Sequence, residues 1–151
     1  MKRAWTLAAA GLLAAFALAA AGAYSPLLGV RWPTPPHPES SSVYGAQKSL
    51  LAFQASVLMY QGQRCEEGEL YAWPERDNER ILTIAKEVAR SIAEAGWVGQ
   101  WNVDAFPLYF PKADTGAFGV FAQGSTRHLA AIGLAAYEGS GLLLFACRIS
   151  P

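Results

Sequence analysis

The first 23 residues limit what the remainder of this chain can fold into. Lys2 and Arg3 follow the initial Met, and residues 6–23 then carry no charged side chain. A short basic head followed by an apolar stretch that ends in small residues is typical of a secretion signal. We therefore expect the rest of the chain to fold outside the cytoplasm, as a secreted, periplasmic or other cell-envelope protein.

The same N-terminal stretch has two alternative fates. Small residues at positions 19–23 satisfy the rule for signal peptidase and favour cleavage near Tyr24. The uncharged run also approaches the ~20 residues that a transmembrane helix needs. Its many alanines contribute little to membrane insertion, which makes an uncleaved anchor the less favoured alternative. If the segment is kept, residues 1–23 are the membrane contact that we expect.

The next segment, residues 24–42, is predicted to be a Pro/Ser-rich linker. Its prolines at positions 33, 35, 36 and 38 are incompatible with a helix or a central strand. An extended, polyproline-like conformation follows, which would act as a spacer above a membrane or as a flexible tail after cleavage. Residues 43–151 then form a single small domain, and the chain is long enough for a core without a structural metal.

Residues 79–95 carry the clearest helical pattern. Asp77 or Asn78 can cap the start, and Gly96 supplies a left-handed stop. Charged residues occupy the opposite face, so we expect the helix to pack on its own domain. The apolar positions at helical spacing are Ile81, Ile84, Val88 and Ile92.

Residues 46–60 are ambiguous between helix and strand. Leu50, Phe53 and Val57 share a helical face, but the set Leu51, Phe53, Val57 and Met59 also fits an alternating strand. The length and the content of Ala, Gln, Leu and Met favour a helix that ends at Gly62.

The C-terminal half indicates an antiparallel sheet. Residues 117–123, 128–137 and 142–149 are compatible with strands, and the last run is apolar enough to be buried on both sides. Residues 69–73 suit an edge strand, whereas Pro107 restricts 102–110 to an edge or an irregular segment. We predict an α+β, two-layer domain in which one or two helices cover one face of an antiparallel sheet of about four strands.

Cys65 and Cys147 are the two cysteines of the chain. In an oxidising compartment an isolated pair favours a disulfide, and two buried thiols are the alternative. The loop that such a bond closes is long, and the chain-entropy relation gives a stabilisation of roughly 4–5 kcal/mol. The disulfide would tie the last strand to the segment before the helix at residues 79–95.

The composition disfavours several classes of function. Basic and acidic residues are balanced, at 12 each, so no basic surface is expected for nucleic acid. His37 lies in the proline-rich segment, which leaves His128 and a bonded cysteine pair, too few ligands for zinc. Glu66, Glu67 and Glu69 do not have the spacing of a calcium loop. We expect neither a metal nor a cofactor.

Aromatic residues are concentrated in one segment of the domain. Such rings can form a contact surface for a partner, because flat amphipathic side chains bind with little loss of entropy. The alternative is that they close the open side of a small sheet. The candidate binding residues are Trp97, Trp101, Phe106, Tyr109 and Phe110.

These observations favour a non-catalytic, exported binding or interaction module. Its expected partner is another envelope protein or a glycan. An accessory subunit of an envelope assembly, anchored by residues 1–23, is the alternative. A small extracytoplasmic hydrolase built on Ser125 and His128 is the least favoured hypothesis, because no known nucleophile motif surrounds these residues.

Overall fold

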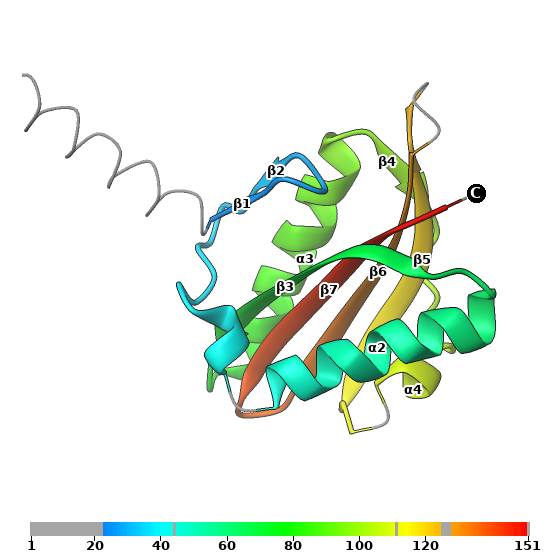
Figure 1. Cartoon of the computed structure of the whole chain (residues 1–151). Coiled ribbons are helices and arrows are strands. Elements are labelled where there is room, and N and C mark those ends of the chain that lie inside the picture. The colour runs from blue at the N-terminus through cyan, green and yellow to red at the C-terminus, as the bar shows by residue number, and fades with distance from the viewer. Residues whose placement is uncertain (1–22, 44, 111, 125–127, 151) are drawn as a thin grey trace, which may run out of the picture.

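The structure, a computed structural model, describes residues 23–43, 45–110, 112–124 and 128–150. Its centre is a five-stranded antiparallel sheet with the strand order β3-β7-β6-β5-β4 (Figure 1). The last three strands follow one another as a meander, and β3 pairs with the final strand. The strands are β3 (Cys65–Pro74), β4 (Trp97–Gly99), β5 (Thr115–Gln123), β6 (His128–Tyr137) and β7 (Gly141–Ile149).

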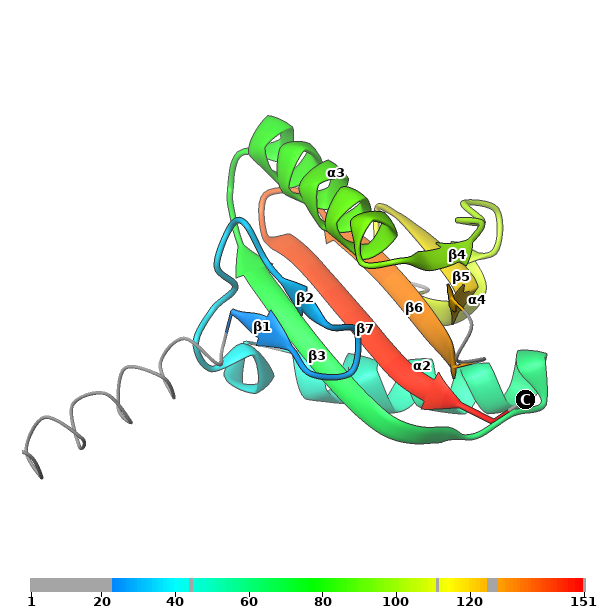
Figure 2. The ribbon, with the colours of Figure 1, turned by 90° about the horizontal axis from the view of Figure 1, so that it is seen from above.

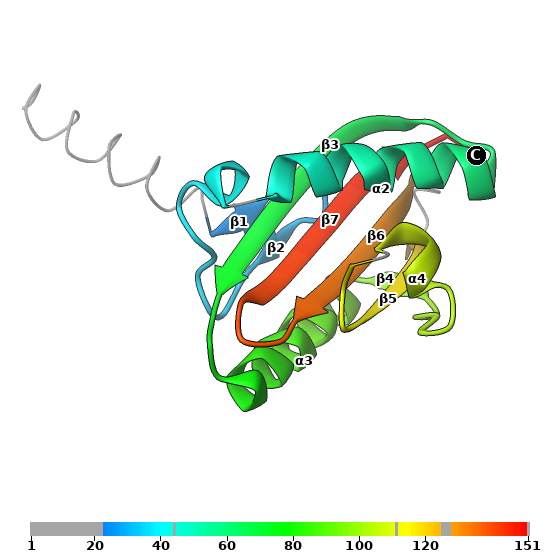
Figure 3. The same cartoon turned by 90° about the horizontal axis from the view of Figure 1, so that it is seen from below.

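Helices cover both faces of this sheet. The helix α3 (Asn78–Glu94) lies on one face, and α2 (Ala46–Gln61) lies on the other with the short helix α4 (Phe106–Tyr109), as Figures 2 and 3 show. Successive side chains of a strand point to opposite faces. Leu142 and Leu144 of β7 therefore join the core beneath α3, whereas Leu143 and Phe145 join the core beneath α2.

The α+β class and the antiparallel sheet expected from the sequence are confirmed. The sheet has five strands rather than about four, because β4 adds a short strand at the edge beside β5. The helices are divided between the two faces, whereas the sequence analysis placed them on one. The apolar run of β7, buried along almost its whole length, requires this second helical layer.

The segment at 46–60 is a helix, α2, bounded by Gly45 and Gly62, which both have positive φ angles. Phe53 and Val57 are fully buried against the sheet. Leu51 and Met59 point outward and are largely exposed. These outward apolar residues produced the alternating pattern that suited a strand.

The helix predicted at 79–95 is confirmed as α3. Asp77 caps it by accepting a hydrogen bond from the backbone N–H of Glu79 at 3.0 Å. Such a cap satisfies one of the free N–H groups in the first turn. The residues expected to be apolar and buried, Ile81, Ile84, Val88 and Ile92, are all buried.

Residues 24–42 pack on the domain instead of forming a free linker. They contain β1 (Tyr24–Ser25) and β2 (Val30–Arg31), a small hairpin on the α3 side of the sheet, followed by the 3-10 helix η1 (Ser40–Ser42) (Figure 2). Leu28 and Trp32 are buried in the same core as α3. Proline excluded helix and central strand here, but it did not prevent the intervening apolar residues from being buried.

The expected signal or anchor lies outside the described residues, apart from Ala23. Among the helices that the structure describes, none combines the length and the hydropathy needed to cross a bilayer.

Candidate functional site

The aromatic residues proposed as a contact surface are divided between the two cores. Trp97 is buried on the α3 side, and its indole Nε1 donates a hydrogen bond to the backbone oxygen of Leu28 at 2.8 Å. Trp101 is half-buried on the same side, with its ring centroid 4.8 Å from that of Phe121. These two rings close the core over the β4 edge.

The remaining three candidates lie on the α2 side. Tyr109 stacks on Phe118 with a centroid distance of 3.8 Å, and Phe110 stacks on Phe53 at 5.7 Å. Tyr109 and Phe110 are buried, and Phe106 is half-buried against the same cluster. The five rings therefore belong to opposite faces of the sheet and do not form one contact surface.

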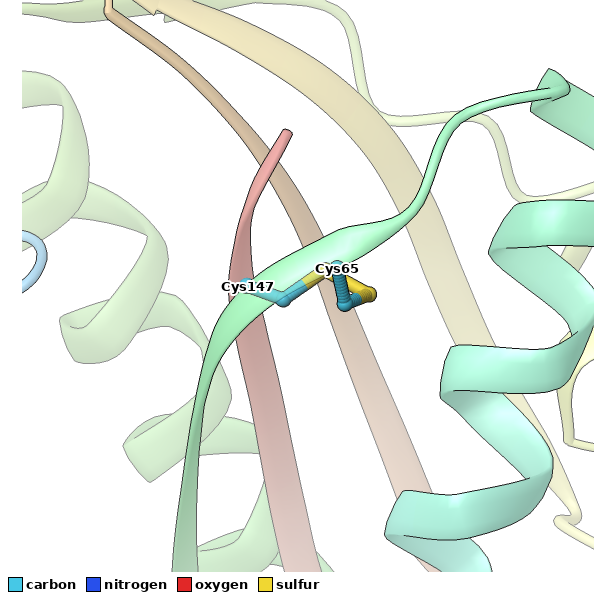
Figure 4. Close-up of a disulfide and its surroundings, with 2 residues drawn as sticks. All are labelled: Cys65 and Cys147. Atoms are coloured by element: carbon cyan, nitrogen blue, oxygen red, sulfur yellow. A yellow bond between two sulfur atoms is a disulfide. The ribbon is translucent and has the colours of Figure 1, made fainter. Parts of the chain in front are cut away.

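The predicted disulfide is present between Cys65 and Cys147. It joins the neighbouring strands β3 and β7, with 5.2 Å between the two Cα atoms, as Figure 4 shows. The two residues are separated by 82 positions in the sequence. The bond therefore links the strand that follows α2 to the last strand of the chain.

Glu69, one member of the acidic cluster, holds the N-terminal hairpin. Its carboxylate accepts hydrogen bonds from the Ser25 hydroxyl at 2.5 Å, the Leu27 backbone N–H at 2.9 Å and the Tyr71 hydroxyl at 2.9 Å. Burial, and then the negative charge of Glu69, raise the pKa of Tyr71 well above its usual value. Glu69 therefore acts as a structural tether of the hairpin.

The other two acidic residues also have protein partners. Glu66 accepts a hydrogen bond from Ser150, and Glu67 lies 3.9 Å from the Arg148 guanidinium. Within the described part of the chain, no group of three His, Cys, Asp or Glu residues could hold a metal ion.

The hydrolase hypothesis remains a prediction. His128 is exposed at the start of β6, paired in register with Gln123 at the end of β5. Ser125 and Arg127 lie outside the described residues, so the structure does not show their relation to His128.

A groove of about 1010 Å³ is lined by the start of α2, the end of β3 and the start of β7. These three segments lie at the lower left of Figure 1. We call it the α2 groove. Its apolar lining on the α2 side of the sheet, the floor of the groove, includes Val43, Ala72 and Leu143, and Ala72 lies opposite Leu143 in the paired strands. Pro74, at the end of β3, adds an exposed apolar side chain. Ala72 and Leu143 are buried, whereas Val43 is half-buried. The polar side chains that line the groove are Ser41, Ser42, Gln47, Lys48, Ser49, Lys112, Tyr137 and Ser140.

Two lysines give the α2 groove a positive rim. Lys48 comes from the first turns of α2 and Lys112 from the loop before β5, and both are exposed. Among the described residues, neither ammonium group has a carboxylate within 4.0 Å; the one ion pair found there joins Arg148 and Glu67. No described Asp or Glu lines the groove. The rim thus carries unpaired positive charge above an apolar floor.

Tyr137 closes one side of the groove at the end of β6. Burial raises the pKa of its hydroxyl, a hydrogen bond with Ser49 acts in the opposite direction, and the charge of Asp114 adds to the increase. The Asp114 carboxylate itself accepts the backbone N–H of Glu138 at 2.7 Å. The Asp114 carboxylate is therefore already engaged by the protein, and it does not line the groove.

The α2 groove could not be predicted from the sequence. Its residues come from η1, α2, β3, β6, β7 and two loops, so no contiguous motif marks it. One local signal was visible, since Lys48 is the single charged residue between Ala46 and Gln61.

The chain matches no protein family, no curated protein and no solved structure. Its class therefore follows from its own geometry: an α+β domain with a disulfide-linked antiparallel sheet and a groove at one end of that sheet.

Proposed function

We propose that this chain is an exported, non-catalytic binding module, and that the α2 groove is its ligand site. One observation supports this choice above the others: the groove combines an apolar floor with a rim of polar side chains. Small-molecule sites are concave, mainly apolar and fitted with a few polar groups, at about 300–1,000 Å³. The volume of the α2 groove, about 1010 Å³, lies at the upper limit of that range.

The floor of the groove is also preorganised. Ala72 and Leu143 lie opposite each other on paired strands, and both belong to the core beneath α2. Residues on hydrogen-bonded strands lose little freedom when a ligand arrives, which lowers the entropic cost of binding. A ligand would therefore meet a surface that is already in place.

Export is supported by the cysteine pair and the N-terminal sequence. Disulfides persist in oxidising compartments and are rare in the cytosol. The chain joins Cys65 to Cys147 and begins with a basic head followed by an uncharged apolar run.

The ligand site is tested with Nile red, a neutral dye that fluoresces in apolar surroundings. We expect saturable binding to the protein as its host produces it. Gln47→Trp should abolish this binding, because Gln47 is exposed and lines the groove. Leu51→Trp is the matched control, since Leu51 is exposed on the same helix and lies outside the groove lining. Equal dye binding by both variants would place the site elsewhere.

Export is tested separately by the intact mass of the chain isolated from its natural host. We expect a mass that lacks the first 21 or 23 residues, and no titratable thiol. Retention of Met1 would instead favour the membrane-anchored accessory subunit, and two free thiols in a cytosolic fraction would refute export.

A further inference from the structure

We propose that the ligand of the α2 groove is a single-chain amphiphile with a carboxylate head, such as a long-chain fatty acid anion. This inference rests on the proposed function, because it names the chemical class of ligand for the same site. It follows from two features that lie side by side in the groove, a pair of unpaired lysines and an apolar floor.

The lysines are gathered at this site although the chain as a whole has no excess of positive charge. The sequence has 12 basic and 12 acidic residues, and of the three lysines in the described residues, Lys48 and Lys112 line the groove. No carboxylate within the described chain neutralises either of them. An anionic group bound in the groove would gain favourable charge interactions with these lysines without displacing a protein partner.

Serine hydroxyl groups in the groove also favour an anionic ligand. Ser41 and Ser140 line the groove, and within the described residues neither side chain hydroxyl is engaged in a hydrogen bond. Both can donate to a carboxylate oxygen, and hydrogen bonds to a charged acceptor are stronger than those between neutral groups.

The apolar lining of the groove favours a ligand that has an apolar tail as well as a charged head group. Val43 and Pro74 provide apolar surface that is half-buried and exposed, respectively, and the buried Leu143 also lines the groove. A small inorganic anion would satisfy the lysines and leave this surface in contact with water. An alkyl chain would remove it from water, which is favourable in proportion to the apolar area covered.

The experiment compares ligands that share a tail and differ in the head. Dodecanoate and dodecyltrimethylammonium, each below its micelle concentration, compete with Nile red for the full chain, and acetate serves as a head without a tail. We expect dodecanoate to displace the dye at a concentration at least tenfold lower than the cation does. Acetate should not displace the dye at the same concentrations.

Two variants assign the preference to the lysines. The double substitution Lys48→Gln/Lys112→Gln should raise the dodecanoate concentration needed for displacement about tenfold, while Nile red itself still binds. The matched control is Lys86→Gln, because Lys86 is an exposed lysine on α3 and lies outside the groove. This control should behave like the unchanged protein.

The outcomes separate the two proposals. If Nile red binds and both dodecyl ligands displace it equally, or the double variant keeps the preference, the carboxylate proposal is wrong and the groove remains a binding site. Displacement by acetate would show an anion site that needs no tail, which also overturns the proposal. Equilibrium dialysis of dodecanoate measures the acid directly; no retention of dodecanoate together with no dye binding would refute both.

Discussion

The carboxylate of Glu69 connects two parts of the chain that are more than forty positions apart. It accepts hydrogen bonds from Ser25 and Leu27 of the N-terminal segment and from Tyr71 of its own strand. Hydrogen bonds to a charged group contribute about 1.5–3 kcal/mol each when they are partly buried. Glu69 therefore adds to the attachment of the β1–β2 hairpin, beside the buried Leu28 and its hydrogen bond from Trp97.

We expect Glu69→Gln to lower the free energy of unfolding by about 1–3 kcal/mol, because an amide nitrogen replaces one of the accepting oxygens. Urea unfolding measures the change. The matched control is Glu67→Gln two positions away, where the side chain is 62% exposed and its ion pair with Arg148 spans 3.9 Å. An exposed pair of this kind contributes about 0–1 kcal/mol, so the control should be nearly neutral. Equal losses in both variants would contradict the tether.

The raised pKa of Tyr71 leads us to expect that the stability of the folded protein depends on pH in the alkaline range. Its pKa in the folded protein is raised above the usual 10.0, first by burial and then by the charge of Glu69. As the pH rises above 10, the unfolded chain loses this proton while the folded chain retains it. The folded state therefore loses stability with increasing pH in that range. Below pH 10 both states keep the proton, and the contribution is constant.

The prediction is measured by urea unfolding between pH 8 and 11, about one to two units around the normal tyrosine value. Tyr71→Phe should flatten the alkaline decline, and the raised pKa of Tyr137 should preserve part of it. Tyr60→Phe, at a tyrosine that is 47% exposed, is the control and should leave the profile unchanged. A profile that is identical in the Tyr71 variant would contradict the assignment.

Among the helices, α2 differs from α3 in how it uses its apolar residues. The apolar residues of α3 lie mainly on one stripe, so the sequence predicted its position and its buried face. In α2 the apolar residues are spread around the helix, with Phe53 buried and Leu51 and Met59 exposed. Periodicity alone could not separate helix from strand there, and length and composition had to decide.

We expect Phe53→Ala to lower the free energy of unfolding by about 3–5 kcal/mol, because removing a buried aromatic ring leaves a cavity. The ring is fully buried between Phe110 and Phe145, with centroid distances of 5.7 and 5.6 Å. Met59→Ala on the same helix is the control and should change stability by less than about 0.5 kcal/mol, since Met59 is 73% exposed. Thermal or urea unfolding distinguishes the two; a costly Met59 variant would show that its side chain is covered in solution.

The two-sided cover of the sheet is a property of the whole molecule that single elements did not reveal. Helix α3 connects β3 at one edge of the sheet to β4 at the other, so it crosses one face. Helix α2 precedes β3 and occupies the opposite face (Figure 3). Each helix has an apolar side that would suit either face, so their amphipathic patterns could not assign the layers. The sequence predicted the class of fold and most strands, but not this division.

The candidate site shows the same limit. The aromatic segment was recognisable because its residues are close in sequence, yet the fold sends Trp97 to one core and Tyr109 to the other. The α2 groove was not recognisable because Lys48 and Lys112 line the same groove only through the tertiary structure. The disulfide could be predicted because Cys65 and Cys147 have no competing cysteine.

We expect the double substitution Cys65→Ala/Cys147→Ala to lower the free energy of unfolding by about 2–5 kcal/mol, since the unfolded chain regains the freedom of a long loop. Urea unfolding of the variant and of the oxidised protein measures the loss. Adding a reductant should destabilise the oxidised protein by a similar amount and leave the variant unaffected. A reductant effect on the variant would point to another cause.

The burial of Leu28 and Trp32 also determines how far this domain can stand from any upstream attachment. If residues 24–42 were a free linker of 19 residues, the domain could move far from its point of attachment. Instead, this segment packs on the domain. If the chain were anchored in a membrane just before Ala23, almost no free linker would separate the domain from the lipid surface. A protease would, for the same reason, have to unfold part of the hairpin before it could cut between Tyr24 and Arg31.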